Sequence, residues 1–349
     1  MAISDDFADA TIRHQVYLQR YKSGVVNKIL ALLKGVESDI VQQVAKRDLQ
    51  SLTRRQVDQL LANLKRKIDQ GYEPVIDLLN DQVKQLAGYE KRWQMDMFSK
   101  TVPIELDFVA PSDEQIIASV IARPFQGLQL KDWYKGLPDG QFRRLREAIR
   151  QGYVDGDTTQ QIVQAIRGTK TTSGILSISR RAAETTARTA LSHTANVARN
   201  QVYRRNRRLI KSVEWVATLD GRTSAICRAR DGKVYPTDSG PRPPAHPACR
   251  STTIPVLKSL RELGIKADEV PVKSTRASMN GQVSSELNYG AWLRKQPVSF
   301  QNEVLGIKKA QLFRRGDLAM DRFVDRKGNE LTLDQLRERE SAAWAKAGL

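Results

Sequence analysis

Three side chains suited to metal binding or nucleophilic chemistry lie within one short stretch of the chain. His246 and Cys249 are three residues apart in a proline-rich loop, and Cys227 lies nineteen residues before His246. Thiolate and imidazole are ligands that suit tetrahedral zinc. A structural zinc site takes four ligands, and this stretch supplies three. Ser224 and Ser251 stand where further cysteines would complete C-x-x-C and C-x-C.

This Cys/His trio leaves three interpretations open. The thiols could be buried and unligated beside a hydrogen-bonded histidine. They could bind zinc, with a carboxylate such as Asp231 as a fourth ligand. Cys227 and Cys249 could also form a disulfide, but only after the protein leaves the reducing cytoplasm.

A cysteine nucleophile with His246 as its base is the catalytic reading of the same residues. It needs a lowered thiol pKa and a third group that orients the base. An arginine follows each cysteine and would help to lower the thiol pKa. The proline-rich loop, however, offers no evident hydrogen-bond donors that could stabilise an oxyanion. The P-loop, H-E-x-x-H, G-x-S-x-G and G-x-G-x-x-G motifs are absent from the sequence. We therefore expect no enzyme, and no cofactor other than a possible zinc ion.

The other two histidines are expected to be structural. His14 lies in the first predicted helix and is interpreted as a surface or packing residue. His193 shares a helical face with Ala190 and Val197, so we expect a buried histidine whose hydrogen bonds are satisfied.

The chain is strongly basic, with a formal net charge of +18. A charge of this size makes a polyanion the leading partner class, with nucleic acid ahead of a membrane surface. General solubility is the alternative, because basic residues are interleaved with acidic ones. The strongest cluster predicts contacts to DNA phosphates, against the alternative of a solvated helix end. It consists of Arg199, Arg204, Arg205, Arg207, Arg208 and Lys211.

Composition limits the class of protein further. Hydrophobic residues make up 40 % of the chain and aromatic residues only 6 %, which favours helix bundles over β-sandwiches. No run of eighteen apolar residues occurs, so we expect no membrane span. The segment 1–8 lacks an apolar stretch and is not expected to be a secretory signal.

The N-terminal hundred residues predict long amphipathic helices. Apolar residues recur at steps of three and four along 26–44, 57–68 and 75–93. The sequence predicts breaks at 51–53, where Thr53 can cap the next helix, and at Gly71 and Pro74. The apolar faces of these helices must be buried. We favour burial within an antiparallel helix bundle over packing of the helices on a partner protein.

The remainder predicts shorter elements. Helices are expected over 142–153, 158–166 and 179–208. A small α/β module follows, with strands near 213–219, 233–235 and 252–256 and a helix over 223–230 capped by Thr223. The segment 257–285 is polar and is predicted to be mobile, and short helices follow it, with Gly306 and Gly316 as left-handed helix ends. The fold class is therefore mainly α. The predicted segments are a helical domain over 1–102, a helical middle region over 103–211, the α/β module over 212–257 and a linker with helical tail over 258–349.

Several short motifs, taken in order, carry a family likeness. They are A-R-T-A at 187–190, A-N-V-A-R at 195–199, W-V-A-T-L-D at 215–220, Arg222, Thr223, Cys227, Asp231, Gly232 and P-P-A-H-P-A-C-R at 243–250. The set resembles the Mu F-like head morphogenesis domain of phage minor capsid proteins over roughly 111–257. That family often shows C-x-x-C and H-P-x-C-R-C, so Ser224 and Ser251 put an inherited metal site in doubt.

The resemblance implies a structural minor head protein of a tailed bacteriophage. Its partners would be the portal protein, inner capsid proteins and double-stranded DNA. It would be made in the host cytoplasm and reside in the virion, in the head interior or at the portal vertex, with roles in head assembly and genome ejection. One alternative is a nucleic-acid-processing or transferase-like effector enzyme built on 180–256. Another is a DNA-binding adaptor that never enters the particle.

Overall fold

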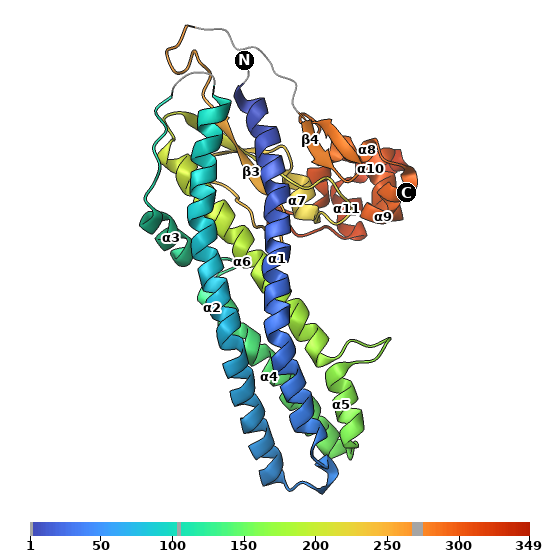
Figure 1. Ribbon diagram of the computed structural model, residues 1–349. Helices are drawn as coiled ribbons and strands as arrows, with labels where there is room; N and C mark the ends of the chain where they lie inside the picture. Colours follow the sequence, from blue (N-terminus) through green and yellow to red (C-terminus); the bar gives the residue numbers. More distant parts are fainter. Residues whose placement is uncertain (1–2, 103–105, 267–274) are drawn as a thin grey trace. The chain divides into compact units, whose positions relative to one another are not determined.

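The chain is mainly helical in the computed structural model, which describes residues 3–102, 106–266 and 275–349 (Figure 1). The predicted fold class is confirmed. Two compact units divide the chain. Unit 1 comprises 1–19, 90–112 and 196–349, and unit 2 comprises 20–89 and 113–195. Both units draw on segments far apart in sequence, because three long helices contribute residues to both. The four consecutive segments expected from the sequence remain a prediction about domain organisation.

Parts of two long antiparallel helices, residues 20–45 and 54–89, form the first part of unit 2. Helix α1 spans Ile3–Ala45, a short 3₁₀ helix η1 spans Leu49–Ser51, and α2 spans Arg54–Thr101. The Tyr21 hydroxyl donates to Gln82 at 2.8 Å, and Val36 lies against Gly71. The apolar stripe predicted over 26–44 is buried throughout. The predicted break at 51–53 is confirmed, and the Thr53 side chain caps α2 with Gln56.

The predicted second break at Gly71 and Pro74 is wrong, because α2 continues through both residues. Packing overrides the helix-breaking tendency of proline here, since Ile68, Val75 and Leu79 on either side are fully buried. Gly71 has a different purpose. A Cβ at this position would lie 2.2 Å from Cγ2 of Val36, so glycine allows the two helices to approach closely.

Four further helical segments complete unit 2. They are α3 (Asp113–Ala122), α4 (Leu130–Asp155), α5 (Thr159–Arg167) and the first part of α6 (Ile175–Arg205). Thr158 caps α5 through a capping box with Gln161. The Arg180 guanidinium binds the Glu37 carboxylate, and the buried Lys22 ammonium donates to the Ser192 hydroxyl at 2.8 Å. These contacts tie α6 to α1 within this unit.

Unit 1 contains the predicted α/β module. Its three-stranded antiparallel sheet has the order β2-β1-β3, with β1 at Ile210–Val216, β2 at Val234–Pro236 and β3 at Thr252–Leu257. In β1, Val213 pairs with Tyr235 on one side, and Trp215 pairs with Thr253 on the other. Helix α7 spans Ala225–Arg230 between β1 and β2. The sequence pattern thus located every strand of this sheet.

A hairpin follows where the sequence predicted a polar, mobile segment. Strands β4 (Thr275–Ser278) and β5 (Gly281–Ser284) pair antiparallel, which corrects that prediction for the described part of 257–285. The physical reason is a buried ion pair. Arg276 of β4 reaches Asp231 and is only 3 % exposed. The rest of the predicted segment, 267–274, lies outside the described residues.

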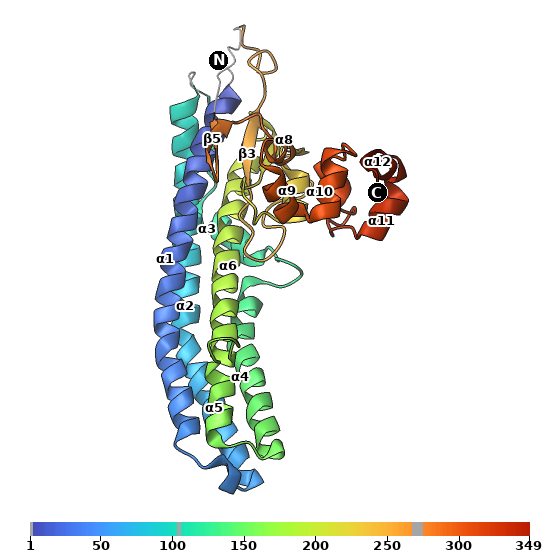
Figure 2. The same ribbon diagram turned by 90° about the vertical axis from the view of Figure 1, so that its right-hand side faces the viewer.

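Five short helices and a 3₁₀ helix end the chain, and Figure 2 shows the short helices grouped together. Their apolar side chains form a core of their own. The helices are α8 (Tyr289–Arg294), α9 (Val298–Leu305), α10 (Ile307–Arg314), η2 (Met320–Phe323), α11 (Leu333–Arg339) and α12 (Ser341–Ala347). Tyr289, Trp292 and Phe313 are fully buried in this core. Gly306 ends α9 with a positive φ of 76°, as predicted, but its ψ of 151° lies outside the left-handed helical region.

The prediction of a left-handed helix end at Gly316 is wrong, because the positive φ of 55° falls on Asp317. A Cβ on Gly316 would lie 2.5 Å from the Ala343 carbonyl oxygen, so close packing explains this glycine. No helix in the described parts of the chain has the length and apolar character needed to cross a bilayer.

Candidate metal centre and basic surface

The module brings the three residues of the Cys/His trio together. Cys227 lies on α7, and His246 and Cys249 lie in the loop between β2 and β3. The two cysteines form no disulfide in the structure, and both are buried, at 2 % and 1 % exposure. They pack in an apolar cluster with Trp215, whose side chain covers them from β1. The loop and the helix are therefore held on one face of the sheet.

The ligand atoms of the trio all lie within 4.8 Å of one another. Sγ of Cys227 is 3.6 Å from Sγ of Cys249 and 3.4 Å from Nε2 of His246. The Nδ1 atom of His246 lies 2.9 Å from the Pro247 carbonyl oxygen, and since a carbonyl can only accept, Nδ1–H is the donor. In the neutral imidazole, Nε2 then presents its lone pair to the sulfur atoms.

The two serines that stand where cysteines would complete C-x-x-C and C-x-C both lie beside the trio. The Ser224 hydroxyl lies 2.8 Å from Nε2 of His246, and the hydroxyls of Ser224 and Ser251 each hydrogen-bond to Cys227. Ser224, and not Thr223 as predicted, occupies the N-cap position of α7. Its side chain makes no capping hydrogen bond, because its hydroxyl contacts His246 instead.

The two thiols differ in acidity. The hydrogen bond from Cys227, aided by His246, holds the pKa of Cys249 well below its usual value despite burial. The same contact, together with burial, raises the pKa of Cys227. The hydrogen bond with Cys249 raises the pKa of His246. Cys249 is thus the thiol that loses its proton first.

Asp231 is not a ligand of this site, which corrects that part of the zinc interpretation. Its carboxylate accepts hydrogen bonds from the backbone N–H groups of Ala217 and Tyr289, each at 2.6 Å, and from the Arg276 guanidinium at 3.0 Å. All of its acceptor capacity faces these donors. It joins β1, α7, β4 and α8 in the core of unit 1.

The basic cluster near the end of α6 divides into a buried and an exposed part. The prediction that Arg199 contacts DNA is wrong, because its side chain is fully buried and bound to Glu90 at 2.6 Å. Five of the six predicted residues are exposed, namely Arg204, Arg205, Arg207, Arg208 and Lys211. Lys211 pairs with Glu262 at 2.7 Å. The four arginines lie on the last residues of α6 and the turn before β1.

Glu90 is the buried anion that Arg199 requires. Its carboxylate also lies 2.7 Å from Nε2 of His14, whose ring stacks on Trp93, so His14 is a packing residue. Burial alone would raise the pKa of Glu90, but Arg199 and His14 outweigh it and lower the pKa to about 2. The charged carboxylate is therefore maintained inside unit 1.

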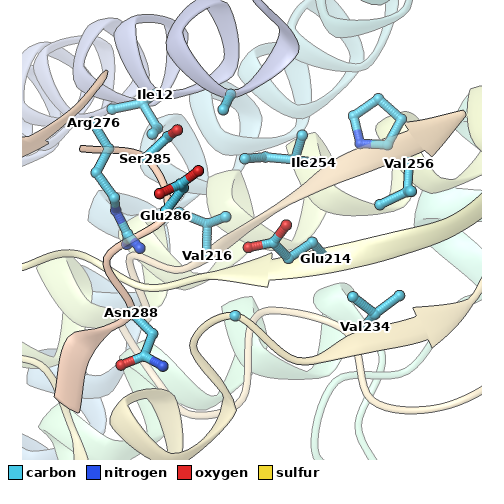
Figure 3. A pocket seen from close by; sticks show the side chains of 13 residues that line it. Ile12, Glu214, Val216, Val234, Ile254, Val256, Arg276, Ser285, Glu286 and Asn288 are labelled. Carbon is cyan, nitrogen blue, oxygen red and sulfur yellow. The ribbon is translucent and has the colours of Figure 1, made fainter. Parts of the chain in front are cut away.

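A cavity of about 410 Å³ lies on the opposite face of the sheet from the trio (Figure 3). Glu214 and Val216 of β1 line it, whereas Trp215, which alternates with them, covers the thiols. Ile254 and Val256 of β3 form much of its apolar floor. The Arg276 side chain at its edge is held by Asp231. None of the trio lines this cavity.

Comparison with known proteins bears on the segment that contains these features. Residues 143–254 match the family described as Phage Mu protein F like protein. The resemblance found in the sequence is confirmed over this segment. The matched range includes the second half of α4, α5, α6, β1, α7, β2 and the Cys/His trio. No curated protein and no solved structure matches the chain.

Proposed function

We propose that this protein is a minor head protein of a tailed bacteriophage. The observation that carries the proposal is the phage Mu protein F like match over 143–254, which holds both the long α6 helix and the Cys/His trio. The protein is made in the host cytoplasm, joins the head during assembly and stays in the virion, in the head interior or at the portal vertex. Its protein partners are the portal and inner capsid proteins.

The second part of the proposal is contact with packaged double-stranded DNA. A net charge of +18 supports it, as do four adjacent exposed arginines at positions 204, 205, 207 and 208. Guanidinium groups bind phosphate oxygens without reading the base sequence. This contact suits a protein that meets the genome during packaging and ejection, where every sequence passes the same surface.

No observation of similar weight supports the alternative that this protein is an enzyme. The trio supplies a thiol and an imidazole within 3.4 Å, but both thiols are buried against Trp215. The cavity on the other face of the sheet holds an arginine that is already paired with Asp231. The polar groups of the cavity and of the trio therefore do not converge on one place where a substrate could react.

Quantitative proteomics of purified, DNA-filled particles tests the proposal. We expect peptides of this chain in the particles, at far lower abundance than those of the major capsid protein. Treating particles with nuclease before purification provides the control, because it removes protein carried on external DNA. Peptides that occur only in the infected-cell lysate would overturn the proposal and favour an adaptor that stays outside the particle.

A further inference from the structure

We propose that the Cys/His trio binds one zinc ion through three protein ligands and that Ser224 faces the fourth, exchangeable position. The site proposed for this chain differs from a four-ligand zinc site in that one ligand position is not filled by the protein. It does not depend on whether the protein enters a phage particle. Three observations support it: the separations of the ligand atoms, the orientation of the imidazole and the direction of the Ser224 hydroxyl.

The two separations that involve the Cys227 sulfur are those of a tetrahedral site. With zinc–sulfur bonds of about 2.3 Å and zinc–nitrogen bonds of about 2.0 Å, tetrahedral angles place two sulfurs about 3.8 Å apart and sulfur and nitrogen about 3.5 Å apart. The Cys227–Cys249 and Cys227–His246 separations are 3.6 and 3.4 Å. Both separations that involve Cys227 thus fit a tetrahedron, and the ligand atoms of Cys249 and His246 lie within 4.8 Å of each other, so an ion needs only limited movement of these side chains to bind.

The imidazole is oriented as a metal ligand by a contact outside the trio. Histidine ligands commonly donate their second ring N–H to a carbonyl or carboxylate, which fixes the tautomer that binds the metal. His246 makes this contact through Nδ1 to the Pro247 carbonyl oxygen at 2.9 Å. Nε2 is then the coordinating atom, and it is the atom that faces Cys227.

Ser224 is placed differently from Ser251. Its hydroxyl contacts two ligand residues, Cys227 and His246, whereas the Ser251 hydroxyl hydrogen-bonds to Cys227. A serine at an N-cap normally bonds to the backbone of the next turn. Here that bond is not made, and the hydroxyl points to Nε2 of His246. Ser224 therefore faces the corner that the trio leaves open.

A site with three protein ligands behaves differently from a closed four-ligand site, because its fourth position can exchange. Two thiolates neutralise the charge of the ion, and a water molecule held by the Ser224 hydroxyl completes the tetrahedron. The ion would link α7 to the loop between β2 and β3, so its binding free energy contributes to folding of the module. The fourth position would accept an exchangeable ligand.

Cobalt(II) titration of the full chain, purified under reducing conditions, tests the inference. Cobalt replaces zinc, and its sulfur-to-metal charge-transfer absorption reports the number of bound thiolates. We expect saturation at one equivalent with the intensity of two thiolates. Ser224→Cys should raise that intensity by about half and tighten binding by about tenfold or more, because a third thiolate closes the site. Ser251→Cys is the matched control and should leave the intensity at two thiolates.

Thermal unfolding of each variant and a thiol assay separate the other outcomes. Two reactive thiols on denaturation and no cobalt absorption would overturn the zinc site and leave a packed thiol pair. Absence of both thiols without reductant would identify a disulfide in its place. A gain of thiolate absorption in Ser251→Cys but not in Ser224→Cys, with both variants folded, would overturn the assignment of the fourth position to Ser224.

Discussion

The Asp231 carboxylate and the Arg276 guanidinium form an ion pair at 3.0 Å in the core of unit 1. The Asp231 side chain is fully buried and that of Arg276 is 4 % exposed. Arg276 also donates to the backbone carbonyls of Ala217 and Leu287. The pair thus connects the hairpin β4–β5 to the sheet and to α8, across more than forty residues of sequence.

Arg276→Met should destabilise the protein by about 3–5 kcal/mol, because it leaves the Asp231 carboxylate buried without its cation. Chemical denaturation with a probe of unit 1, such as fluorescence of its buried tryptophans, measures the change. The double variant Arg276→Met with Asp231→Asn is the control, and it should lose less than the sum of the two single variants. Strictly additive losses would mean that the two residues act independently.

The hairpin shows where sequence reasoning failed and why. Periodicity predicted the long helices and strand β1, because each has a regular apolar face. Strand β2 has no such face, since none of its three residues is buried. Strands β4 and β5 are four residues each and polar, so their signal comes from the partner of Arg276, which lies 45 residues earlier. A single sequence carries no sign of such a long-range ion pair.

The basic cluster likewise contains a residue whose environment depends on a partner far away in the sequence. Arg199 has five basic neighbours in sequence, yet it is buried because Glu90 lies opposite it. Glu90 lies four residues after the buried Leu86, on the apolar face of α2, and this placement is the only signal that could have indicated a buried anion. The Cys/His trio was predictable from spacing, but the contacts of Ser224 required the structure.

Gly71→Ala should lower stability even though alanine is the better helix former. The added Cβ would lie 2.2 Å from the Val36 side chain, so the helices must separate or the side chain must shift. We expect a net loss of up to about 2 kcal/mol, since an overpacking cost of about 1–3 kcal/mol is offset by a gain in helix propensity of about 1 kcal/mol. Urea denaturation measures it.

Shortening the Val36 side chain should reduce this effect. In the background Val36→Ala, Gly71→Ala should cost much less, because the 2.2 Å contact with Cγ2 is removed and the closest contact left is that with the Cβ at 3.2 Å. Equal losses in both backgrounds would show that Val36 is not the cause, and that Gly71 is required for another reason.

His193 should make unit 2 less stable in acid. Burial lowers its pKa to about 4, from an unfolded value near 6.5, despite hydrogen bonds to the backbone of Val120 and Arg123. The expectation that all its hydrogen bonds are satisfied is wrong, because the buried Nε2 atom has no hydrogen-bond partner among the described residues. The neutral form is favoured in the folded state, so its contribution is complete above about pH 6.5 and is lost as the pH falls toward 4. At pH 4, the free energy of unfolding should have fallen by about 3 kcal/mol through this residue.

Denaturation of the wild type and of His193→Asn between pH 7 and pH 4 measures this contribution. Asparagine keeps a side-chain N–H donor but does not titrate in this range. The variant should therefore lose less stability than the wild type over that interval, whatever its stability at pH 7. Parallel curves for the two proteins would show that His193 does not protonate on unfolding.

DNA binding by the arginine cluster gives the most direct test of the proposed contact with the genome. Replacing Arg204, Arg205, Arg207 and Arg208 with Gln removes four exposed cations at the end of α6. Each lost phosphate contact reduces the slope of log K against log salt by about 0.9, so the slope should flatten by up to about 3–4. Binding to unrelated duplexes should weaken equally, because phosphate contacts carry no base information. Folding should remain intact, since these side chains are exposed.

The matched control removes the same charge from another surface. The exposed basic residues of α4 at 131, 135, 143 and 146 can all be replaced with Gln, which also lowers the net charge by four. If the arginine cluster is the DNA contact, this variant should keep the slope of the wild type, because phosphates that are not touched release no counterions. An equal change in both variants would mean that binding depends on total charge. A wild-type slope in the folded cluster variant would assign these arginines to solvent or to a protein interface.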